Sequence, residues 1–286
     1  MGVGKMGLPM AEHLARAGYA LTVSDPGAQS LELARSRGLT VASDVPGALA
    51  AADVVLSSLP NDAALRGVAA QLAQHARAGA VYVDISTVSS QASAEVARVL
   101  AGKGVDYVRT AVSGNNKMAE AGQLTVLASG PRASYERVLP VLKIIGANCF
   151  YLGEAEQARL MKLVVNLMIA QTSAMLAEAL ALGRKGGLDW RDMWQVLTHS
   201  AVASPIVKAK SVQLVERDFT PTYTVEQIIK DLTLILGAGE ASEVFLPQTA
   251  MTLQLMQDAI AQGDGLEDYA AIIKVVERKS NLPTKL

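Results

Sequence analysis

The chain has 286 residues, of which 50% are hydrophobic and 19% are charged, and its formal net charge is −1. This composition is typical of a globular protein with a sizeable core and excludes an intrinsically disordered chain. The near-neutral charge comes without a basic run, so we expect no nucleic-acid partner and no membrane partner. The single cysteine, Cys149, excludes an internal disulfide framework. Together with the lack of a leader-like segment, it leads us to expect a cytoplasmic protein.

Short β-rich runs alternate with helical patterns throughout the first half of the chain. Repeated strand–helix–strand order of this kind predicts a Rossmann-like, doubly wound parallel sheet. The β-rich runs cover residues 20–24, 53–57, 80–84, 105–109 and 124–128, and the helical patterns cover residues 5–17, 30–36, 61–73 and 91–100.

The second half of the chain contains only helical patterns after about Gly153. We therefore predict an α/β domain over residues 1–152 and an all-α domain over residues 153–286, joined by a long helix at about 154–185. This helix is apolar nearly all round, but polar side chains interrupt it, so we expect a helix buried between layers or subunits rather than a membrane span. The helical patterns are 154–185, 190–200, 206–215, 224–241, 247–261 and 266–278.

The chain opens with a G-x-G-x-x-G pattern formed by Gly2, Gly4 and Gly7. In a dinucleotide-binding turn the first glycine allows the tight turn and the second lets the backbone approach the pyrophosphate. The third lets the helix pack closely on the strand. Asp25 ends the next β-rich run about twenty residues later, where a carboxylate would accept hydrogen bonds from the ribose hydroxyls. That carboxylate repels a 2′-phosphate and Pro26 and Gly27 offer no cation, so NAD is favoured over NADP. An ordinary glycine-rich turn is the alternative interpretation.

The strand that normally precedes such a turn is missing, because only Met1 stands before Gly2. We expect about five to eight residues of apolar strand to be absent from this sequence. That strand would lie in the middle of the sheet, so its absence should lower stability.

Five stretches, in order along almost the whole chain, resemble motifs of the β-hydroxyacid dehydrogenases. This is the family of 3-hydroxyisobutyrate dehydrogenase and tartronate semialdehyde reductase, with a 6-phosphogluconate dehydrogenase-like architecture. In that family S-G-G is usual in the substrate loop, whereas this chain reads Ser113-Gly114-Asn115. This departure affects the expected identity of the substrate and not the expected reaction class. The stretches are GVGKMGLPMAEHLARAG (cofactor fingerprint), VDISTVS at 83–89, VSGNNKMAEAGQLT at 112–125 (substrate loop), KLVVN at 162–166 and KDL at 230–232.

The resemblance implies that Lys162 and Asn166 are catalytic. Their spacing of four places them on one helix face, one turn apart. A buried lysine has a lowered pKa and can exchange a proton near neutral pH, while the amide orients the ammonium or binds the substrate hydroxyl. Without the resemblance, a lysine that snorkels to water would explain the pattern equally well.

The resemblance also implies a set of binding residues, each with a plain structural alternative. Ser113 and Gly114 could form an ordinary turn, the residues at strand ends could simply end the strands, and Lys230 and Asp231 could be a solvated charge pair. Phe219 could be a core residue. The implied cofactor contacts are Gly2, Val3, Gly4, Lys5, Met6, Gly7, Asp25, Leu59, Pro60, Thr87 and Lys230, and the implied substrate contacts are Ser113, Gly114, Asn115, Thr87, Phe219 and Asp231.

We therefore expect an enzyme that transfers hydride between NAD and a small β-hydroxy acid, similar to 3-hydroxyisobutyrate or to the product of tartronate semialdehyde reduction. The resemblance and the apolar joining helix lead us to expect a homodimer or homotetramer, and no acidic or histidine cluster indicates a metal. Two alternatives remain. One is an imine reductase-like enzyme, a class that shares the architecture but replaces the lysine. The other is a dinucleotide-binding protein without catalysis.

Overall fold

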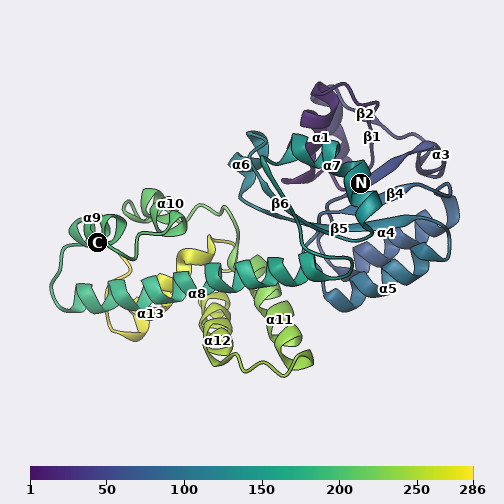
Figure 1. Cartoon of the computed structure of the whole chain (residues 1–286). Helices are drawn as coiled ribbons and strands as arrows, with labels where there is room; N and C mark the ends of the chain where they lie inside the picture. The colour runs from purple at the N-terminus through teal and green to yellow at the C-terminus, as the bar shows by residue number, and fades with distance from the viewer. Residues whose placement is uncertain (286) are drawn as a thin grey trace. The chain divides into compact units, whose positions relative to one another are not determined.

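The structure, a computed structural model, describes residues 1–285 and divides the chain into two compact units (Figure 1). The first unit is Met1–Lys162, and the second begins at Leu163. The boundary lies inside helix α8 (Gln157–Lys185), whereas the sequence placed a domain boundary before that helix. The first turn of α8 belongs to the first unit because Ala158 and Arg159 are buried among its residues.

The first unit contains seven strands and seven helices. All five predicted β-rich runs overlap a strand, but the sequence missed β2, β7, α3, α6 and α7. Two of these, β2 and α6, are very short, and Pro140 lies inside α7, where it disturbs the helical pattern. The strands are β1 (Thr22–Val23), β2 (Thr40–Val41), β3 (Val54–Ser57), β4 (Val81–Asp84), β5 (Asp106–Ser113), β6 (Thr125–Ser129) and β7 (Asn148–Tyr151); the helices are α1 (Gly7–Arg16), α2 (Ala28–Ser36), α3 (Val45–Ala51), α4 (Asp62–His75), α5 (Ser90–Ala101), α6 (Asn116–Glu120) and α7 (Arg132–Ile145).

The strands form two sheets, one of β1 and β2 and one in the order β3-β4-β5-β6-β7. The predicted parallel, Rossmann-like arrangement is confirmed for β3, β4 and β5, with Val83 opposite Val108. One strand pair within the sheet is an exception: although β6 is parallel to β7, it runs antiparallel to β5, with Val112 opposite Val126. The connection between these two strands holds only the short helix α6, and a parallel crossover needs a dozen or more residues.

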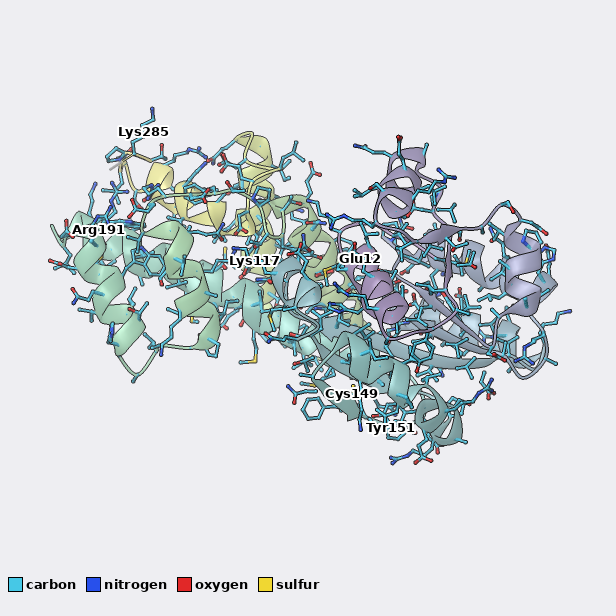
Figure 2. The ribbon with its side chains drawn as sticks, turned by 90° about the horizontal axis from the view of Figure 1, so that it is seen from above. Glu12, Lys117, Cys149, Tyr151, Arg191 and Lys285 are labelled. Atoms are coloured by element: carbon cyan, nitrogen blue, oxygen red, sulfur yellow. The ribbon has the colours of Figure 1, made fainter. Side chains whose placement is uncertain are left out.

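Helices cover both faces of the five-stranded sheet (Figure 1). Alternate residues of β4 point to opposite faces, so Val83 packs with the residues of α1 and α7, while Tyr82 packs with those of α4 and α5. All four residues of β4 are buried, as expected for a strand that is covered on both sides. At the far edge, Cys149 and Tyr151 lie on the same side of β7 (Figure 2). Cys149 is only half-buried, and burial raises the pKa of its thiol, which favours the unreactive form.

The second unit is built of helices, as the sequence predicted. Side chains cap several of them: Ser204 accepts a hydrogen bond from the backbone N–H of Val207, and Thr224 forms a capping box with Gln227. The helices are the remainder of α8, α9 (Trp190–His199), α10 (Pro205–Leu214), α11 (Val225–Ala241), α12 (Pro247–Ala261), the 3₁₀ turn η1 (Tyr269–Ala271) and α13 (Ile272–Lys279).

Helix α8 is apolar on two sides, but only one side is buried within this chain. Its inner side, which includes Ala170 and Leu180, packs into the core of the second unit. Its outer side carries an exposed line of large apolar residues seven positions apart, which we call the α8 stripe: Met161, Met168, Met175 and Leu182, with exposed fractions of 38%, 65%, 63% and 77%. Within residues 1–285, α8 is also the one helix whose length and apolar composition would allow it to cross a membrane.

Candidate functional site

The glycine loop before α1 has a backbone that only glycine allows at two positions. Gly2 has φ +79°, and a Cβ there would lie 2.2 Å from the carbonyl oxygen of Ser58. A Cβ at Gly7 would lie 1.9 Å from the carbonyl oxygen of Gly2. A Cβ at Gly4, by contrast, would meet no atom of residues 1–285 within 4 Å. The outer glycines are therefore required by the turn itself, and the middle one leaves open space beside the backbone.

The glycine loop and Asp25 are joined by a hydrogen bond. One carboxylate oxygen of Asp25 accepts the backbone N–H of Val3 at 2.9 Å, and the other accepts that of Gly27 at 2.7 Å. No side chain caps the start of α1, and although the N–H of Leu8 donates to the carbonyl oxygen of Gly4 at 3.0 Å, the N-terminal donors and the positive end of the helix dipole favour an anion here. The donors, the open space at Gly4 and the carboxylate fit the pyrophosphate and ribose of a dinucleotide.

Two loops at the carboxyl ends of β3 and β4 hold three more predicted cofactor residues. Leu59 and Pro60 follow β3, and Thr87 follows β4. The loops are tied together, because the backbone N–H of Leu59 donates to the hydroxyl of Ser86 at 2.8 Å. These three residues therefore lie at the edge of the sheet where ligands of parallel sheets bind.

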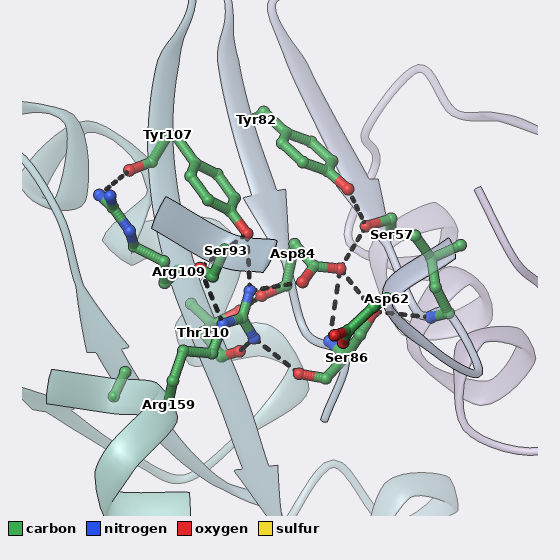
Figure 3. Close-up of polar contacts among 12 residues, drawn as sticks. Ser57, Asp62, Tyr82, Asp84, Ser86, Ser93, Tyr107, Arg109, Thr110 and Arg159 are labelled. Carbon is green, nitrogen blue, oxygen red and sulfur yellow. Dashed lines mark hydrogen bonds and ion pairs between the residues drawn. The ribbon is translucent and has the colours of Figure 1, made fainter. Parts of the chain in front are cut away.

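A buried polar network lies beneath these loops (Figure 3). Asp84, at the end of β4, has no exposed surface. One of its carboxylate oxygens accepts the hydroxyls of Ser57 at 2.6 Å and Ser86 at 2.5 Å. The other forms an ion pair with Arg159 of α8. A buried carboxylate is costly unless it is paired in this way, so the network fixes the ends of β3 and β4.

Arg159 completes this network. Its guanidinium donates at 2.6 Å to the carbonyl oxygens of Ser86 and Thr110 and at 2.8 Å to the hydroxyl of Tyr107. The residue is 1% exposed, so the first turn of α8 is anchored to the sheet by a fully buried charge. The sequence analysis missed it. The available signal was an arginine at the start of an otherwise apolar helix, three residues before Lys162.

The predicted substrate loop starts where β5 ends, at Ser113. Gly114 has φ +135°, and a Cβ there would lie 2.7 Å from a methyl carbon of Leu124. Asn115 has a structural role, since its side-chain oxygen accepts the backbone N–H of Met118 at 3.1 Å and caps the short helix α6. The amide that departs from the family pattern is thus a helix cap.

The residues around Asn166 form a buried cluster in the second unit, which we call the Asp231 cluster. Asn166 is 5% exposed, and its side-chain NH₂ donates to Asp231 at 2.6 Å. The hydroxyl of Tyr223 donates to the same carboxylate oxygen at 2.9 Å, and the Lys230 ammonium lies 3.2 Å from the other oxygen. Burial, followed by the charge of Asp231, raises the pKa of Tyr223 well above its usual value, so Tyr223 remains a hydrogen-bond donor. Asp231 itself is fully buried, so it holds its neighbours in place.

Lys162 is partly buried and stands one turn before Asn166 on α8, as predicted. Phe219 does not join the Asp231 cluster. It packs against the core of the second unit, with the Lys274 ammonium 4.4 Å and the Arg217 guanidinium 5.6 Å from its ring. Tyr223, four residues later, is the aromatic residue beside Asp231. The sequence analysis missed Tyr223, although it lies in the same T-P-T-Y-T segment that follows Phe219.

A metal site is not indicated in residues 1–285, where no group of three or more His, Cys, Asp and Glu side chains is placed to hold an ion.

Comparison with known sequences identifies relatives over nearly the whole chain. Residues 1–153 match the family described as the NAD-binding domain of 6-phosphogluconate dehydrogenase. Residues 157–276 match the family described as "NAD-binding of NADP-dependent 3-hydroxyisobutyrate dehydrogenase". The 2-(hydroxymethyl)glutarate dehydrogenase of Eubacterium barkeri is 35% identical over 287 residues, which cover 99% of this chain and 95% of that protein.

Comparison with solved structures also identifies relatives over nearly the whole chain. The crystal structure of 3-hydroxyisobutyrate dehydrogenase from Salmonella typhimurium is 28% identical, with a TM-score of 0.86 over 96% of this chain and 97% of that chain. The Mycobacterium tuberculosis 3-hydroxyisobutyrate dehydrogenase, solved with L-serine, is 26% identical, with a TM-score of 0.89 over the same shares.

Proposed function

Because the chain belongs to the β-hydroxyacid dehydrogenase family, we propose that Lys162 is the general acid and base with which it oxidises a small β-hydroxy acid and reduces the corresponding carbonyl compound. The enzyme class follows from relatives that are named as hydroxy-acid dehydrogenases and semialdehyde reductases. When bound, NAD would supply the hydride acceptor for oxidation, and its reduced form would supply the hydride donor for reduction. The chain's own residues supply binding, orientation and proton transfer.

Lys162 takes the proton of the substrate hydroxyl during oxidation and returns it during reduction. Its partly buried position on α8 suits it to exchange a proton with a bound substrate. The positive charge of the protonated form also stabilises a developing alkoxide.

One observation carries the proposal: the 2.6 Å hydrogen bond that holds Asn166 to the buried carboxylate of Asp231, one helical turn from Lys162. An amide that is fixed on one side by a carboxylate presents its remaining N–H and its carbonyl oxygen in a defined direction. Such an amide is suited to orient the substrate hydroxyl. If Lys230 and Asp231 were only a structural charge pair, the fixed orientation of Asn166 would serve no function. We propose Asp231 and Tyr223 as positioning residues for Asn166.

The substrate carboxylate would be held by Ser113 and the backbone of Gly114 and Asn115, which leave the end of β5 as a turn. Thr87, after the neighbouring strand β4, would contact both substrate and cofactor. The capping role of Asn115 leaves its NH₂ group to a ligand, so substrates with a second polar group are worth testing. The classes we propose are 3-hydroxyisobutyrate-like and tartronate-like acids.

The cofactor we propose is NAD. Val3, Gly4, Lys5 and Met6 would offer backbone N–H groups to the pyrophosphate, and Asp25 would accept the ribose hydroxyls. Further contacts are proposed for Gly2, Gly7, Leu59, Pro60, Thr87 and Lys230.

A soluble homodimer or homotetramer in the cytoplasm is the state we propose for the protein. The α8 stripe supports it, because four large apolar side chains on one line of a helix gain stability when a second copy covers them. Lys162, Asn166, Gln171 and Glu178 interrupt the apolar sequence of α8, which favours a core helix over a membrane span.

The test is a turnover screen over small hydroxy acids, with NAD and NADP in parallel, alongside equilibrium NADH binding. We expect NAD-dependent turnover of at least one β-hydroxy acid. Binding of NADH without turnover of any acid would favour a non-catalytic dinucleotide-binding protein, and turnover confined to cyclic imines would favour an imine reductase.

A further inference from the structure

An open pocket of about 420 Å³ lies within the second unit and is lined by cationic side chains. Among the residues that the structure describes, five cations line this pocket and one carboxylate does, that of Glu216. Figure 2 shows two of the cations, Arg191 and Lys285, at one end of the second unit. No member of the Asp231 cluster lines the pocket, so the proposed mechanism does not use it. The cations are Arg191, Arg217, Lys274, Arg278 and Lys285.

Two of these cations are held in place by buried carboxylates. Arg217 forms a double ion pair with Glu277, at 2.8 and 2.6 Å, and Arg278 pairs with Asp264 at 2.6 Å. Glu277 has no exposed surface and Asp264 is 5% exposed, and neither lines the pocket. The carboxylates therefore orient the guanidiniums and leave the surface of the pocket to the cations.

Arg278 keeps donors for a ligand. A guanidinium carries five N–H donors in a rigid fork. Within residues 1–285, the hydrogen bonds of Arg278 to Gln262 and Asp264 use three of them, two at Nη1 and one at Nη2. The Nε–H and the second Nη2–H remain along one edge of the guanidinium, and the side chain is 34% exposed. Two parallel N–H groups of this kind match two oxygens of a phosphate.

The position of Arg217 requires an unfavourable backbone. Its φ of +53° falls just after the end of α10, where glycine is the usual residue, because a Cβ disfavours this conformation. Strain of this kind persists where the surrounding structure holds it, often at ligand sites. Here the guanidinium lies 5.0 Å from the ring of Trp190 and 5.6 Å from that of Phe219. The Lys274 ammonium lies 4.4 Å from the Phe219 ring, so two cations meet at one apolar wall.

We propose that this pocket binds a small organic phosphate, with the dianion held by the cations and the organic part packed on Val215 and Phe219. Cations gathered around one space repel each other, and a dianion offsets that repulsion more fully than a single charge does. The volume is that of a site for a small molecule. The cations come from α9, the turn after α10, α13 and the residues that follow α13, so a bound ligand joins these elements and stabilises the second unit.

The test is calorimetric titration of the full chain with phenyl phosphate at constant ionic strength, with benzoate as the singly charged probe. Arg278→Met removes the proposed phosphate donors, while Lys274 remains 3.5 Å from Asp264 as its partner. Lys279→Met is the matched control, because Lys279 lies on the same helix, is 57% exposed and does not line the pocket. Glu216→Gln removes the carboxylate at the pocket surface. The melting temperature of each variant without ligand reports whether it is folded.

We expect phenyl phosphate to bind and to raise the melting temperature, and benzoate to bind at least tenfold more weakly. Arg278→Met should weaken the binding of phenyl phosphate at least tenfold, since it removes charge-assisted hydrogen bonds. Lys279→Met should leave the affinity within about twofold, as expected for a cation outside the pocket. Glu216→Gln should strengthen binding, which damage to the fold would not do.

Absence of phenyl phosphate binding at millimolar concentrations would overturn the proposal, and so would equal affinities in Arg278→Met and the unaltered protein. Competition by NAD would place the phosphate at the glycine loop and would also overturn it. If Arg278→Met does not fold, Glu216→Gln decides, and an affinity no higher than that of the unaltered protein contradicts the proposal. No readout uses turnover, so the result is independent of the proposed reaction.

Discussion

Replacement of Arg159 by methionine tests whether the buried network holds the first turn of α8 to the sheet. Methionine keeps an unbranched side chain of similar reach but removes the guanidinium. The substitution deletes the ion pair to Asp84 and the hydrogen bonds to Ser86, Thr110 and Tyr107. Asp84, with no exposed surface, is then left with the hydroxyls of Ser57 and Ser86 and the backbone N–H of Ser86 as donors, and with no positive charge as a partner.

The size of the effect follows from that unpaired carboxylate. Removal of one partner of a buried ion pair costs about 3–5 kcal/mol, which is a large part of the stability of a typical domain. For a unit of this size the melting temperature should fall by roughly 6–20 °C. We expect the double variant Arg159→Met with Asp84→Asn to be more stable than Arg159→Met alone, because the second change removes the uncompensated charge.

The assay is urea unfolding followed by circular dichroism, with kcat measured on the folded variants. Arg132→Met is the matched control, since Arg132 is 58% exposed and pairs with Glu136 on the surface; no measurable change is expected there. A loss below about 1 kcal/mol for Arg159→Met would refute the argument, because the network would then carry no net stability.

Three further outcomes are expected. Lys162→Ala should lower kcat by roughly 10²–10⁴-fold with little change in NADH affinity, and near-normal kcat in this variant would remove the lysine from the mechanism. Lys162→Arg should not restore kcat, because a guanidinium does not release its proton. Asp25→Ala should narrow the ratio of kcat/KM for NAD over NADP, and a wild-type preference for NADP would contradict the role of that carboxylate. Gly7→Ala should lower the melting temperature without ligand, since its Cβ would overlap the Gly2 carbonyl. Gly4→Ala should leave the melting temperature unchanged and weaken NADH binding. A larger loss of melting temperature for Gly4→Ala than for Gly7→Ala would be inconsistent with the loop geometry.

The sequence predicted most of the elements that lie in the core. β4 and β5 are dense in valine and tyrosine and buried on both faces, so composition alone identifies them as strands. The direction of β6 was not predictable in this way. A β-rich run has the same composition in a parallel and an antiparallel pair, and only the short connection through α6 separates the two.

The candidate site was predictable to the extent that its residues stand in local patterns. The glycine loop and the Lys162–Asn166 spacing are such patterns, and the structure shows the contact between the loop and Asp25. For Asn115 the sequence analysis predicted a substrate contact, which stays a prediction, and missed the role of the side chain as the cap of α6. The partners of Arg159 come from three separate segments, the end of β4, α5 and β5, so no spacing in the sequence reveals them.

The α8 stripe gives the proposed assembly a chemical vulnerability. Three of its four members are methionines, and oxidation of a thioether to a sulfoxide turns an apolar side chain into a polar one. If a second copy covers the stripe, Met161, Met168 and Met175 are shielded while the oligomer persists and exposed when it dissociates. Peroxide would then oxidise the free subunit and hinder its reassociation. Methionine sulfoxide reductases could restore the apolar surface, so association would depend on the oxidative history of the protein.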